Sequence, residues 1–134
     1  MKINRLNSDQ KSEWNFNDAV GKTINSVMLD DDASLHMLFS DGYKIRIRDD
    51  GQSCCERRYM RTDDNLGDYV GAQLLGAEIK NAPNAEVEDV YVHNVYVHNV
   101  QFLEIQTSKG VFVMSSHNEH NRYYGGFYLV VEVC

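Results

Sequence analysis

Apolar and polar residues alternate along two stretches of the chain, each interrupted by a short turn that contains glycine. One stretch spans residues 34–47 around Ser40-Asp41-Gly42, and the other spans residues 102–116 around Ser108-Lys109-Gly110. A period of two on both sides of such a turn predicts a β-hairpin in each stretch. Residues 126–133 are rich in β-branched and aromatic side chains and predict a further strand. The pattern therefore predicts a mostly β chain with short helical segments.

The sequence that precedes the first hairpin recurs before the second. Residues 18–29 match residues 68–79, and the Val-Gly pair ending at Gly21 returns at Gly71, an offset of 50 positions. Apolar residues also recur at equivalent places in the two segments. We interpret this match as one half of an internal duplication.

The hairpins themselves provide the second half of the match. Residues 35–47 align with residues 103–115 at an offset of 68, which pairs Ile45 with Val113. Because this offset exceeds the first by about 18, the second copy is expected to carry an insertion. Alternating strands can resemble one another by chance, but two ordered matches favour a common origin.

The duplication sets the predicted architecture. We expect a single domain, residues 1–134, with pseudo-repeats over 18–61 and 68–133 and an insertion at about 81–100. The predicted fold class is α+β, mostly β: an antiparallel sheet built from two duplicated strand-plus-hairpin units, with short helical segments.

Some apolar residues fall on the strand faces opposite to the main apolar stripe. These residues are Leu38, Phe102, Phe112, Met114 and Tyr128. A soluble monomer rarely exposes a large apolar patch. We therefore expect the other unit or the N-terminal segment to cover them, with a homodimer as the alternative.

The insertion contains the tandem repeat Tyr-Val-His-Asn-Val, at residues 91–95 and again at 96–100. A period of five fits neither a strand nor a helix, so one copy is expected in a loop or a longer hairpin arm. Tyrosine provides stiff contact area and asparagine provides adaptable hydrogen bonds, as in many binding loops. The predicted partner-binding residues are Tyr91, His93, Asn94, Tyr96, His98 and Asn99.

A metal or thiol site is the alternative location for chemistry. Its candidate residues are Cys54, Cys55, His117 and His120. Imidazole and thiolate are preferred zinc ligands, but the spacing matches neither paired Cys-x-x-Cys motifs nor a helical His-Glu-x-x-His motif. We favour a packing role for the cysteines and a polar turn for the histidines, and we expect no cofactor.

Composition and charge exclude several classes of protein. The 134 residues are 43% hydrophobic and 25% charged, which excludes a wholly disordered chain. The net charge is -7 and the basic residues at 44, 46 and 48 are interpreted as a solvated strand face, so nucleic acid is not expected as a partner. No apolar run approaches a membrane span, no export signal is recognised, and an odd number of cysteines fits a reducing cytoplasm.

Two short motifs resemble a known family. Ser53-Cys54-Cys55-Glu56 follows the first hairpin, and Asn121-Arg122-Tyr123-Tyr124 lies near the end of the chain. Together with the Gly-Lys-Thr-Ile strand start, they resemble an uncharacterised family of small proteins found in bacteriophages and bacteria, over about residues 19–132. The tandem repeat is not part of this resemblance. The likeness implies an α+β fold and a phage or prophage setting, and it implies no activity.

The leading functional hypothesis is a small interaction protein, encoded by a phage, that binds or inhibits a host protein such as a component of a defence system in the bacterial cytoplasm. No Ser-His-Asp order, phosphate-binding glycine loop or carboxylate pair is recognisable from spacing, which favours a protein without enzymatic activity. One alternative is a metal- or thiol-dependent enzyme that uses Cys54 or Cys55 with His117 and His120. The other is a structural subunit of a phage assembly.

Overall fold

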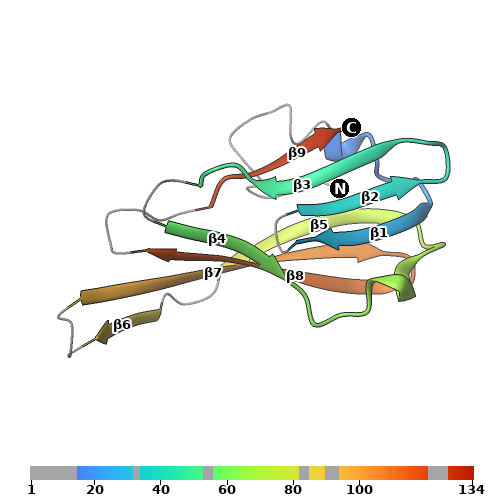
Figure 1. The fold of residues 1–134 in the computed structure, drawn as a ribbon. Coiled ribbons are helices and arrows are strands. Elements are labelled where there is room, and N and C mark those ends of the chain that lie inside the picture. Colours follow the sequence, from blue (N-terminus) through green and yellow to red (C-terminus); the bar gives the residue numbers. More distant parts are fainter. Residues whose placement is uncertain (1–14, 32–33, 53–55, 82–84, 90–93, 121–126) are drawn as a thin grey trace.

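Two antiparallel β-sheets pack face to face in the computed structural model (Figure 1). The structure describes residues 15–31, 34–52, 56–81, 85–89, 94–120 and 127–134, and only the backbone of residues 81, 85–89 and 94–97. Within this part of the chain, helical structure is limited to one turn at residues 15–17 and the 3-10 helix η1, Leu66–Tyr69. The mostly β, antiparallel fold with short helical segments is thus confirmed.

The first sheet has four strands in the order β1-β2-β3-β9. Their bounds are Ile24–Asp30, Ser34–Phe39, Lys44–Asp49 and Leu129–Val133. The second sheet has the order β4-β8-β7-β5, and β6 pairs with the outer part of β7. The bounds of β4, β5, β6, β7 and β8 are Glu56–Arg61, Leu74–Asn81, Ala85–Asp89, Asn94–Thr107 and Gly110–His120.

The antiparallel strands are divided between two sheets, because each hairpin unit forms its own sheet and the units exchange a strand. β4 follows the first hairpin along the chain, yet it pairs with β8 of the second unit. β9 follows the second hairpin, yet it pairs with β3 of the first unit. This exchange brings the apolar faces of the two sheets together.

The two units meet at equivalent backbone positions. The N–H of Gly21 donates to the carbonyl of Leu74 at 2.7 Å, and the N–H of Gly71 donates to the carbonyl of Ile24 at 2.8 Å. The two bonds are equivalent, because the donors and the acceptors each differ by 50 positions and the two units exchange roles. Thr23 and Gln73 form a bridge between them, and both glycines have φ near +90°, a conformation that favours glycine.

The two hairpin turns differ in length by one residue. This difference corrects the alignment of the strand that follows each turn, β3 in the first unit and β8 in the second. Three residues separate the paired Phe39 and Tyr43, whereas two separate Thr107 and Gly110. One residue fewer reverses the faces of every following side chain. Phe112 therefore takes the place that the sequence alignment assigned to Val113.

The core lies between the sheets and draws on both. Its largest fully buried side chains belong to residues 16, 24, 35, 37, 39, 45, 47, 60, 74 and 112. Met114 is also fully buried, so neither it nor Phe112 points away from the core as the sequence had predicted. Of the other three residues expected outside, Leu38 is half-buried, Phe102 is 36% exposed and Tyr128 is 51% exposed.

Candidate functional site

The outer face of the five-stranded sheet is the candidate site. No described helix or strand covers it, and the four-stranded sheet packs on its other side (Figure 1). Strand alternation places two groups on opposite faces of β8: the even-numbered residues from 112 to 120 are buried, and the odd-numbered residues face outward. The outward row continues across β4 and β7 through residues 57, 59, 61, 98, 100 and 102.

Tyr59 is the centre of an aromatic and cationic cluster on this face. Its ring stacks on the ring of His117, with centroids 4.7 Å apart and planes 4° from parallel. The guanidinium carbons of Arg57 and Arg61 lie 4.8 and 5.1 Å from its centroid. Burial, followed by the charge of Glu119, raises the pKa of the Tyr59 hydroxyl. Tyr59 is thus a neutral, partly covered ring beside two cations.

His98 and His117 are hydrogen-bonded to each other across β7 and β8. The distance between His98 Nε2 and His117 Nδ1 is 2.9 Å, and His117 Nε2 lies 2.8 Å from the Ser115 hydroxyl. Burial, then His98 and Arg61, lowers the pKa of His117. One nitrogen of the pair must donate and the other accept, so the contact suits neutral rings.

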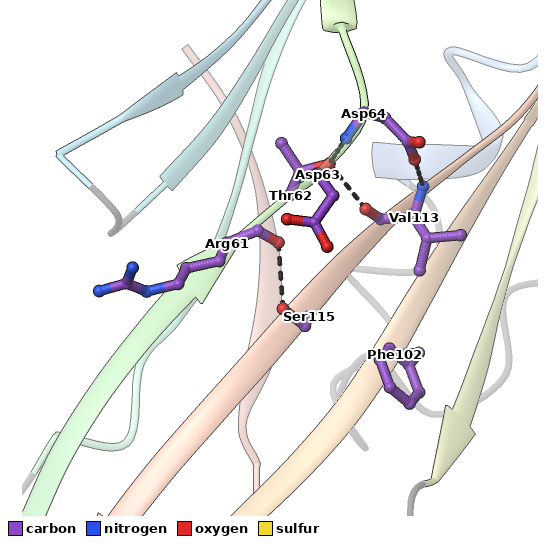
Figure 2. A pocket seen from close by; sticks show the side chains of 7 residues that line it. All are labelled: Arg61, Thr62, Asp63, Asp64, Phe102, Val113 and Ser115. Atoms are coloured by element: carbon purple, nitrogen blue, oxygen red, sulfur yellow. Dashed lines mark hydrogen bonds between the residues drawn. The ribbon is translucent and has the colours of Figure 1, made fainter.

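A hollow of about 230 Å³ adjoins this cluster (Figure 2). Its lining residues are Arg61, Thr62, Asp63, Asp64, Phe102, Val113 and Ser115. Arg61, Ser115 and Phe102 form one row across three strands, because Ser115 pairs with Arg61 on one side and with Phe102 on the other. The hollow therefore lies on the sheet surface, with the chain after β4 forming one wall.

The inner face of the same sheet carries a buried ionic cluster. Arg58 lies 2.9 Å from an Asp49 carboxylate oxygen and 2.9 Å from Glu56 Oε1, and the three side chains are only 4%, 7% and 1% exposed. Asn118 donates to Glu56 Oε2 at 3.0 Å. Asp49 belongs to β3 and Arg58 to β4, so the cluster joins the two sheets. It is closed to a partner and serves the fold.

The predicted arm coincides with the β6–β7 hairpin, which extends past the sandwich (Figure 1). Tyr91 and His93 lie outside the described residues, and only the backbone of Asn94 and Tyr96 is described, both within β7. His98 is half-exposed on the outer face. The predicted contact residues do not form one surface, because Asn99, the last of them, points to the opposite face from His98.

Asn99 is corrected as a contact residue. Its side chain is buried, and its Oδ1 lies 2.5 Å from His120 Nε2. As the neighbour of His98 in a strand, it must point to the opposite face of the sheet. Asn99 therefore belongs to the interior polar network.

The predicted metal site is also corrected. His117 faces outward and His120 is buried on the inner face, because three positions along a strand reverse the side chain. Burial lowers the pKa of His120. Cys54 and Cys55 lie outside the described residues. Among the residues that the structure describes, no group of three or more His, Cys, Asp or Glu could hold a metal ion.

The basic strand β3 carries its own counter-charges. Arg46 and Arg48 both donate to the Glu132 carboxylate of β9, and Arg48 also pairs with Asp50 at 2.7 Å. The hydrogen bonds from Arg48 and Arg46 lower the pKa of Glu132 to about 2. These contacts neutralise most of the basic character of the face.

The low pKa of Glu132 predicts a pH window for its contribution. Because the folded state binds this proton less tightly than the unfolded chain, the stabilisation is complete above about pH 5 and is lost as the pH falls to about 2. Urea unfolding at several pH values should show the difference between wild type and Glu132→Gln shrinking over that range. Arg48→Met removes one partner of Glu132 and should therefore narrow the pH range over which its contribution is lost. If the free energies of unfolding of wild type and Glu132→Gln run parallel over this pH range, the assignment is wrong.

Three residues that define the site were not among the predicted site residues. Tyr59, Asp63 and Phe102 are far apart in the sequence and carry no motif. Alternation in residues 57–61 could have placed Arg57, Tyr59 and Arg61 on one face. The pairing of β4 with β8, which creates the hollow, is a long-range choice that no local pattern indicates.

The fold and the site define an antiparallel two-sheet β protein with an uncovered, aromatic and charged sheet face. The chain belongs to the family described as "Domain of unknown function (DUF7448)", which it matches over residues 17–130. The prediction of an uncharacterised family is confirmed at this level. No curated protein and no solved structure matches the chain. In the described residues, no helix has the length and apolar character required to cross a bilayer.

Proposed function

We propose that the protein is a non-enzymatic interaction protein that binds a partner protein through the outer face of the five-stranded sheet and the β6–β7 arm. The observation that carries this proposal is the uncovered face itself. It presents the Tyr59 cluster, the exposed ring of Phe102 and the adjoining hollow. Aromatic and arginine side chains of this kind dominate the energy of protein interfaces.

The setting of the proposal comes from the resemblance to phage and bacterial proteins. The protein is encoded by a phage and acts in the cytoplasm of the bacterial host, where it binds or inhibits a host protein such as a component of a defence system. Its net charge of -7 favours a basic partner surface and disfavours nucleic acid.

Two alternatives differ in their readout. His117 and His120 point to opposite faces of β8, so the cysteine of a thiol enzyme could act with only one of them. Thiol titration and metal analysis of untagged protein test it. A structural subunit or homodimer would use the uncovered face for copies of this chain, and light scattering across a concentration series tests that.

Affinity capture from host lysate tests the proposed function. Deleting residues 91–95 leaves one copy of the repeat, so the chain before Gln101 keeps the sequence of residues 96–100, of which residues 97–100 pair with β8. We expect the deletion, and separately Tyr59→Ala, to reduce recovery of the partner by about ten-fold, as loss of an interface anchor does.

The matched control lies on the other sheet. Met28 is 57% exposed on β1, so Met28→Ser removes a comparable apolar group from a surface outside the site and should leave recovery unchanged. Circular dichroism checks that each variant folds. If every captured protein survives both the deletion and Tyr59→Ala, this face and arm are not the binding surface.

A further inference from the structure

We propose that the hollow beside β4 binds one arginine side chain of the partner protein, with the guanidinium between the Asp63 carboxylate and the Phe102 ring. This inference rests on the proposed function, because it assigns the chemistry of the partner at that site. It follows from how the walls of the hollow are held and from the charges left inside it.

Two hydrogen bonds position Asp63. On one side, the Thr62 hydroxyl donates to the carbonyl of Val113 at 2.8 Å, and on the other, the Asp64 carboxylate accepts the N–H of Val113 at 2.7 Å. Both neighbours are thus tied to β8. Asp63, between them, directs its carboxylate into the hollow (Figure 2), and within the described chain no hydrogen bond or ion pair reaches it.

The opposite wall is aromatic. Phe102 projects from β7 into the hollow and is 36% exposed, so part of its ring remains accessible to a ligand. A planar guanidinium can stack on such a ring while its N–H groups reach a carboxylate, which an ammonium cannot do equally well. A ring and a carboxylate on facing walls therefore suit arginine.

The negative charge inside the hollow disfavours an anionic ligand. Asp63 and Asp64 supply two carboxylates, whereas the guanidinium of Arg61 extends away from Asp63 (Figure 2). Its central carbon lies 5.1 Å from the centroid of the Tyr59 ring. An anion would meet two like charges and a turned-away cation. The net charge of -7 strengthens attraction of a basic partner over longer distances.

Nuclear magnetic resonance with a small probe tests the inference without the partner. Acetyl-L-arginine methylamide is titrated to about 50 mM into isotopically labelled protein, since one side chain should bind only with a millimolar dissociation constant. We expect saturable shifts at the amides of Asp63, Val113 and Ser115. The citrulline analogue has the same shape without the charge and should produce no saturable shift.

Two variants and one control identify the walls. Asp63→Asn should weaken probe binding about five-fold by removing the charge, and Phe102→Leu should weaken it about three-fold by removing the ring face. Asp68→Asn removes an equivalent charge from η1, outside the hollow, and should leave binding unchanged. Each spectrum also reports whether the variant remains folded.

The outcomes separate this inference from the proposed function. No saturable shift, equal binding of citrulline, or binding unaffected by Asp63→Asn would overturn the arginine site. If the partner is still captured and still depends on Tyr59, the proposed function stands without it. If the probe binds as expected and no partner depends on the face, the proposed function is wrong and the hollow remains an arginine site.

Discussion

Replacing Arg58 by Met is expected to lower the free energy of unfolding by about 3–5 kcal/mol, because it leaves two carboxylates buried without their cation. Asp49 and Glu56 both bind the guanidinium, and all three side chains are at least nine-tenths buried. Burial lowers the pKa of Arg58, but the hydrogen bonds that its guanidinium donates to Glu56 and Asp49, together with their negative charges, raise it overall, which keeps Arg58 charged. Gly51 also packs so closely that an added Cβ would lie 2.8 Å from Arg58 Cζ, so the site has little room to rearrange.

Urea unfolding at neutral pH measures this effect, which corresponds to a midpoint lower by about 2 M for a protein of this size. Arg57→Met is the matched control. That side chain is 69% exposed on the other face of the same strand, and its loss should change the stability by less than about 0.5 kcal/mol. Equal losses for the two variants would show that the buried cluster does not join the sheets.

Replacing Phe112 by Ala is expected to lower the free energy of unfolding by about 3–5 kcal/mol, because it empties a large volume in the core. The Phe112 side chain is fully buried between the sheets, and its ring lies 4.9 Å from that of Tyr69. The neighbouring Val111 is 45% exposed. Val111→Ala should therefore cost less than about 0.5 kcal/mol.

This pair of variants distinguishes the observed strand register from the one that the sequence alignment suggested. In the alternative, Val111 and Val113 face the core and Phe112 faces outward. Thermal or urea unfolding of both variants decides between the two registers. A larger loss for Val111→Ala than for Phe112→Ala would contradict the observed register.

Local patterns predicted much of the fold and little of the site. The alternation around Gly42 and Gly110 indicated both hairpins, and the recurrence of Gly21 at Gly71 indicated segments whose hydrogen bonds are in fact equivalent. β6 and the outer part of β7 lie within the predicted insertion at about residues 81–100. Function is less accessible to such patterns, because Tyr59, Asp63 and Phe102 become neighbours only through strand pairing.

Local sequence alone specified the kind of secondary structure and the places where the chain turns, since alternation and glycine conformation are properties of neighbouring residues. Long-range packing set the exchange of β4 and β9 between the units, the opposite directions of His117 and His120, and the contact of Arg58 with Asp49 inside the sandwich. These features depend on packing because pairing partners are selected by the apolar surface that the whole chain buries at once. One residue fewer in a turn then reverses every face that follows.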